Sequence, residues 1–60
     1  MLIIQAMQIK LIGAPAGYHI EYRAHVEDIG WQEWVRDGKL AGTTGKNKQI
    51  EAIEIRIVKG

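Results

Sequence analysis

The decisive stretch of sequence reads Tyr18-His19-Ile20-Glu21-Tyr22-Arg23-Ala24-His25-Val26-Glu27. Apolar or aromatic residues alternate with charged or imidazole residues at every step. A period of two is typical of a β-strand that has one face in a core and the other in solvent. We therefore predict a strand over residues 18–27. Its core-facing residues are Tyr18, Ile20, Tyr22, Ala24 and Val26.

Turn-forming residues separate this strand from other apolar segments. Ala14-Pro15-Ala16-Gly17 predicts a loop before it, and Asp28-Ile29-Gly30 a turn after it. Further strands are expected over residues 2–12, 31–36 and 49–58, with Asp37-Gly38 as a hairpin-type turn. Glycines expected to serve structure are Gly30, Gly38, Gly42 and Gly45. No segment has helical periodicity, so the expected fold is all-β, built as a four-stranded antiparallel unit.

The two ends of the chain repeat each other. Residues 4–12 align with residues 50–58 at an offset of 46, with identity at Ile4, Ala6 and Ile9. In both copies the apolar positions change parity after the alanine, which predicts a β-bulge or a sharp bend there. Ala52 is thus a structural position, and we expect the Glu51 carboxylate to accept backbone N–H groups beside it. We interpret residues 1–60 as one module: residues 1–13 are the last strand of a preceding repeat, and residues 14–60 are one complete repeat of about 46 residues.

Composition narrows the function. The chain has 60 residues, no cysteine and a net charge of +1, which disfavours two domains, disulfides, thiolate metal sites and a nucleic-acid footprint. It has no serine for a catalytic triad and no apolar run long enough to insert in a membrane. His19 and His25 lie too far apart on one strand to share a metal. We expect neither an enzyme, nor a cofactor, nor a metal site.

A longer motif string points to a known family. The string consists of Gly30-Trp31-Gln32-Glu33-Trp34-Val35, Asp37-Gly38, Ala41-Gly42-Thr43-Thr44-Gly45 and Ile50-Glu51-Ala52-Ile53-Glu54-Ile55. In this order and spacing it resembles the clostridial hydrophobic W repeat, over roughly residues 20–57. The N-terminal Gln5-Ala6-Met7 departs from the family's Glu-Ala-Ile. The resemblance implies tandem repeats, often in threes, in secreted or surface proteins of Gram-positive bacteria, which attach to cell-wall polymers, glycans or surface proteins.

Five residues are candidates for ligand binding. They are Trp34, Trp31, Asp37, Glu51 and His25. A separation of three places the two tryptophans on opposite faces of a regular strand, so they share a face only if a bulge intervenes. We expect Trp31 to pack in the core and to be the more buried, so that Trp31→Ala costs roughly 3–5 kcal/mol. Trp34 is expected to be a surface platform or a subunit contact.

A small chain without disulfides or metal is expected to gain stability by association. We predict a homo-oligomer, with a trimer preferred, arranged as a β-prism or alternatively a β-trefoil. The leading function is non-covalent binding of a cell-wall polymer, glycan or surface protein. The alternative is a purely structural, self-assembling unit, excised or engineered, with no ligand.

Overall fold

A computed structural model of the chain describes residues 4–60 and contains six strands in two antiparallel sheets. The strands are β1 (Ala6–Met7), β2 (Tyr18–Val26), β3 (Gly30–Trp31), β4 (Val35–Arg36), β5 (Ala41–Gly42) and β6 (Ile50–Lys59). The described residues contain no helix, and hence no helix that could cross a membrane. The predicted all-β class is confirmed.

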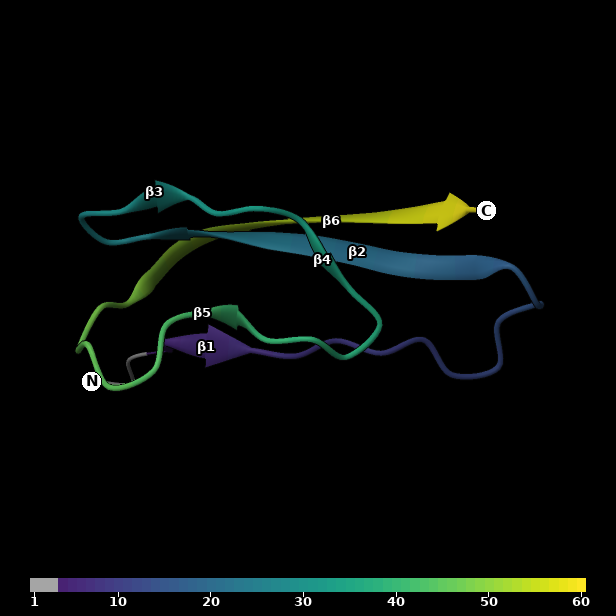
Figure 1. The fold of residues 1–60 in the computed structure, drawn as a ribbon, viewed down its shortest axis with the longest axis horizontal. Helices are drawn as coiled ribbons and strands as arrows, with labels where there is room; N and C mark the ends of the chain where they lie inside the picture. The colour runs from purple at the N-terminus through teal and green to yellow at the C-terminus, as the bar shows by residue number, and fades with distance from the viewer. Residues whose placement is uncertain (1–3) are drawn as a thin grey trace.

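Strand β2 is the centre of the larger sheet (Figure 1). Strand β6 pairs with one edge of β2 along the whole length of β2. Strands β3 and β4 pair with successive parts of the opposite edge of β2. The predicted alternation is confirmed from Ile20 to Val26, whose even-numbered side chains are buried. Tyr18 lies on the same side at the end of the strand but remains 39% exposed. The core therefore lies against one face of β2.

A second layer, formed by β1 and β5, covers this face (Figure 1). Ala41 of β5 is buried in the core, and Met7, Ile9 and Leu11 pack against it. Gly42 allows the two strands to approach. It has a φ of +102°, and a Cβ there would lie 2.8 Å from the Cα of Ala6 and still closer to the preceding carbonyl oxygen.

The N-terminal strand predicted over residues 2–12 is much shorter in the structure. Within the described part of this segment only Ala6–Met7 is strand, and residues 2 and 3 of the prediction lie outside the described residues. The reason is that the backbone partners of this segment come from three separate places. The carbonyls of Ile4, Gln5 and Ile9 accept from the N–H groups of Ile50, Thr43 and Gly38, respectively. A ladder needs one continuous partner, which this segment lacks; β5 itself was not predicted.

The predicted bulge is present in β6. His25 pairs with Ala52, whereas the next residue of β2, Val26, pairs with Ile50. Glu51 is therefore the extra residue, one position before the alanine after which the apolar pattern changes parity. The predicted irregularity is present, but it lies on the other side of Ala52.

The strand predicted over residues 31–36 is interrupted. Register shows why: β2 advances three residues from Tyr22 to His25, while its partner advances four, from Trp31 to Val35. Gln32 itself keeps the register, because its N–H donates to the Ala24 carbonyl at 2.9 Å, so the extra residue lies between Gln32 and Val35. The side-chain amide of Gln32 turns toward Gly42. Gln32 Oε1 accepts from the Gly42 N–H at 2.7 Å, and Gln32 Nε2 donates to the Gly42 carbonyl at 3.2 Å. This exchange ties the large sheet to the second layer.

Asp37-Gly38 forms the predicted tight turn, with φ values of +52° and +88°. The N–H of Lys39 donates to the carbonyl of Arg36 across it, at 3.3 Å. The turn does not close a hairpin, however, because β5 pairs with β1 and not with β4. Gly30 and Gly45 also have positive φ, consistent with the structural role predicted for them.

Candidate functional site

Polar side chains of β2 form the outer face of the large sheet. His19, Glu21, Arg23 and His25 alternate with the core residues, and each pairs with an oppositely charged or ionisable group. Arg23 bonds Glu54 of β6. This face is thus a row of paired polar side chains rather than a set of isolated charges.

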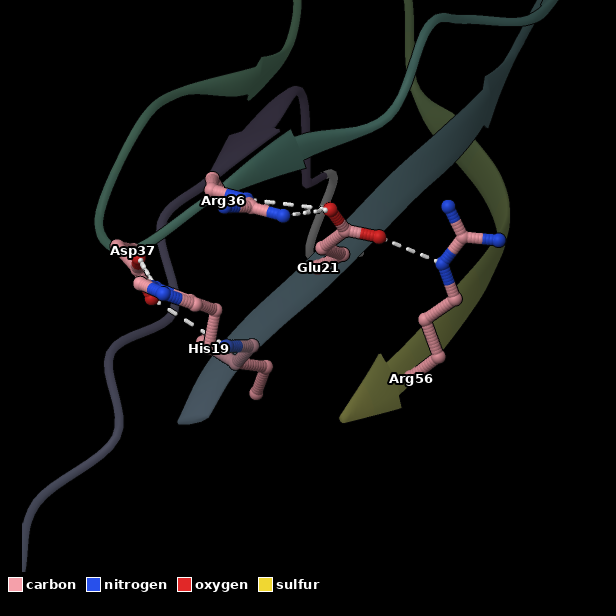
Figure 2. Close-up of polar contacts among 6 residues, drawn as sticks. His19, Glu21, Arg36, Asp37 and Arg56 are labelled. Carbon is pink, nitrogen blue, oxygen red and sulfur yellow. Dashed lines mark hydrogen bonds and ion pairs between the residues drawn. The ribbon is translucent and has the colours of Figure 1, made fainter. Parts of the chain in front are cut away.

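Glu21 is the most connected member of the row (Figure 2). One carboxylate oxygen accepts from Arg36 of β4 at 2.6 Å, and the other from Arg56 of β6 at 2.7 Å. The hydrogen bond from Arg36, followed by that from Arg56, lowers the pKa of Glu21 below its usual 4.5. The carboxylate therefore links three neighbouring strands while it is ionised.

His19 and Asp37 form a second pair near the start of β2. Their Nδ1 and Oδ2 atoms lie 2.6 Å apart, and Asp37 Oδ1 also accepts from the N–H of Ile20 at 3.3 Å (Figure 2). The hydrogen bond from His19 is the main cause that lowers the pKa of Asp37 below 3.8. Asp37 is therefore held in place by the turn and by β2.

Both tryptophans lie on this same outer face, beside one guanidinium group. The guanidinium carbon of Arg23 lies 4.7 Å from the Trp31 ring centroid and 4.9 Å from that of Trp34. Arg56 lies 3.9 Å from the Trp34 centroid. His25 stands edge-on to Trp31, with centroids 5.1 Å apart. We call these five residues the tryptophan–arginine cluster; the extra residue between β3 and β4 brings both indoles to one side.

The expectation that Trp31 packs in the core is wrong. Its side chain is 44% exposed, whereas Trp34 is half-buried. The physical reason is the register: Trp31 pairs with His25, and directly paired residues project from the same face of an antiparallel sheet. His25 faces outward, so Trp31 does too. Trp34 is the more covered because two guanidinium groups pack on it.

The structure brings four of the five candidate residues together. Trp31, Trp34 and His25 belong to the cluster, and Glu51 adjoins it because its Oε1 lies 3.1 Å from Nδ1 of His25. Glu51 thus pairs with a side chain, and not with the backbone N–H groups expected at the bulge. Asp37 pairs with His19 instead, at the opposite end of β2.

Arg23, Arg56 and Glu54 were not singled out from the sequence. The alternating pattern does indicate that these side chains face outward, because each stands at a polar position of a long alternating strand. What the pattern lacked was the register that pairs β2 with β6 and places Arg56 beside Glu21. Such a register is set by tertiary contacts.

The described residues, 4–60, enclose no pocket, and no three potential metal ligands come together among them. The cluster offers one exposed indole edged by guanidinium, imidazole and carboxylate groups. Such a surface can stack on a ring and exchange hydrogen bonds around it.

The fold and this face define a small all-β module with an aromatic outer surface. The family model for the clostridial hydrophobic W repeat matches residues 25–59, which include both tryptophans and all of β6. The chain therefore belongs to the clostridial hydrophobic W family. No curated protein and no solved structure gives a significant match to the chain.

Proposed function

We propose that this chain is a repeat module of a secreted or surface protein, and that its tryptophan–arginine cluster binds a glycan of the cell wall non-covalently. Family membership supports the general role, since the matched segment contains the cluster's two tryptophans. The exposure of Trp31 is the single observation that carries the choice of site. A large indole left 44% exposed among polar groups is typical of a recognition surface.

Charge compensation supports an uncharged sugar over a polyanion. Arg23 is paired with Glu54, and Arg56 shares Glu21 with Arg36. Together with Glu51, which lies beside His25, these carboxylates balance the three guanidinium groups of this face. A polyanion would need uncompensated basic groups, as phosphate-binding surfaces have. A neutral pyranose instead needs an aromatic face and a rim of donors and acceptors, which the cluster supplies.

Retention on cell walls tests this proposal. The chain is incubated with purified peptidoglycan sacculi from a Gram-positive bacterium and, separately, on a glycan array. We expect Trp31→Ala to weaken retention about tenfold, equivalent to roughly 1.4 kcal/mol. Tyr18→Ala is the matched control: Tyr18 is 39% exposed, but it projects from the opposite face of β2. Equal retention of the parent and Trp31→Ala, or no retention of the parent, would contradict the glycan proposal.

A purely structural, self-assembling unit is the second candidate. The exposed isoleucines of β6 favour it, because soluble monomers rarely leave a row of large apolar side chains open. For either function we propose that copies assemble as a trimer about a threefold axis, as a β-prism in preference to a β-trefoil. Sedimentation equilibrium at micromolar concentration tests the assembly; a monomer stable well above room temperature would contradict it.

A further inference from the structure

Three isoleucines of β6 extend the core face of the sheet without being covered. Ile53, Ile55 and Ile57 are 46%, 50% and 54% exposed. Their partners across the ladder are Ala24, Tyr22 and Ile20, respectively. Paired residues project from the same face, so the isoleucines belong to the side that is buried on β2. They form a stripe of apolar surface beside the core.

Among residues 4–60, the backbone along this stripe has no partner strand on one of its edges. The carbonyls of Ile20 and Ala24 accept from the N–H groups of Asp37 and Gln32, on the side of β2 away from β6. Peptide groups alternate in direction along a strand, so these residues form non-hydrogen-bonded pairs with their partners on β6. The N–H and C=O groups of Ile53 and Ile57 therefore point to the open edge of β6.

The N-terminal segment shows what such a stripe contacts. Met7, Ile9 and Leu11 correspond to Ile53, Ile55 and Ile57 at the offset of 46, and in the structure they pack against the core. Their backbone is used on the matching edge. Met7 pairs with Ala41, and the carbonyl of Ile9 accepts from the N–H of Gly38 at 2.8 Å.

The identical positions of the two copies coincide with these contacts. Ala6, which is repeated as Ala52, lies opposite Gly42 where the two backbones approach most closely. Ile9, repeated as Ile55, supplies the carbonyl for the Asp37–Gly38 turn. The parity change after the alanine is also common to both. Strand β6 thus carries the features with which residues 4–11 cover a core.

We propose that β6 is shared between consecutive repeats: it completes the sheet of its own repeat and covers the core of a second copy. The occupant of the isoleucine stripe is that second copy, which presents its β5 and its Asp37–Gly38 turn to the open edge of β6. A symmetric pairing of two β6 strands would use neither the parity change nor Ala52. The stripe lies on the face opposite the tryptophan–arginine cluster, so the assembly does not depend on a ligand.

Hydrogen exchange on a tandem chain tests the sharing. The chain contains residues 1–60 followed directly by a second copy of residues 15–60, which preserves the offset of 46. Amide exchange is measured by NMR at Ile53, Ile55 and Ile57 in both copies. We expect exchange about tenfold slower or more in the first copy, since only that β6 has a following core to cover. Equal exchange in the two copies, or protection of both that rises with concentration, would overturn the proposal.

A matched pair of substitutions gives a second readout. Ile55→Glu is placed either in the first copy or in the last copy of the tandem chain. In the first copy it should lower the urea midpoint clearly, whereas in the last copy it should change it little. Equal shifts would overturn the proposal. If the first-copy variant does not fold while the last-copy variant does, the asymmetry itself supports it, and exchange in the unsubstituted chain remains decisive.

Discussion

Gly42→Ala is the substitution with the clearest structural consequence. Gly42 has a φ of +102°, and its added Cβ would meet the Gln5 carbonyl oxygen and the Cα of Ala6. Both of these atoms belong to the backbone, so no side-chain rotation can relieve the clash. The β1 segment would therefore have to move away from β5.

The magnitude follows from the backbone strain and from the interactions that this movement breaks. A non-glycine residue held at strongly positive φ costs about 1–3 kcal/mol. Separation of β1 from β5 also removes the hydrogen bond from the Thr43 N–H to the Gln5 carbonyl, worth about 1 kcal/mol, and loosens the packing of Met7 on the core. We expect a total of about 4 kcal/mol. A chain of this length has a free energy of unfolding of roughly 3–9 kcal/mol, so much of the protein would be unfolded.

Gly45→Ala is the matched control. Gly45 also has a positive φ, +72°, but no atom of residues 4–60 lies within 4 Å of the position that its Cβ would take. The free energy of unfolding of Gly45→Ala should fall only by the cost of holding alanine at a positive φ, about 1–2 kcal/mol. Urea unfolding followed by tryptophan fluorescence and far-ultraviolet circular dichroism measures both variants. If the two substitutions lower the free energy of unfolding by the same amount, the close approach of β1 and β5 is not what requires glycine at position 42.

Three other predictions concern the core, the outer face and pH. Tyr22 is fully buried and its hydroxyl donates to the Lys39 carbonyl, so Tyr22→Phe should cost about 1 kcal/mol in urea unfolding; no loss would mean that this bond adds nothing. Trp31→Ala should cost only about 1 kcal/mol, far below the roughly 3–5 kcal/mol of a core aromatic, and a melt that shows complete unfolding would place Trp31 back in the core. The pKa of Glu21 is lowered in the folded chain, so its stabilisation should be complete above the ordinary value of 4.5 and be lost as pH falls below it. Urea midpoints measured from pH 7 to pH 3 should show this acid loss, and Glu21→Gln should reduce it; an identical pH profile for the variant would assign the loss to other groups.

The central strand and the side of it that is buried follow from the amino-acid sequence alone. Residues alternate strictly from Tyr18 to Val26, so only one orientation of the strand buries all of its apolar side chains. The parity change in the repeated segment indicated an irregularity in β6 for the same reason, and the structure places it one residue before Ala52, at Glu51. The Asp37-Gly38 dipeptide set a tight turn, since its local backbone preference needs no distant partner.

Tertiary structure decided the site and the second layer. Trp31 lies outside because it pairs with His25, and that pairing depends on where an extra residue between β3 and β4 is inserted. Similarly, β1 and β5 are each only two residues long and are joined by contacts across the fold. Short strands carry too few alternating positions to predict their partners. Register and packing decide which face an aromatic residue occupies and which segments come into contact. The periodicity of a long strand, in contrast, is a local property of the amino-acid sequence.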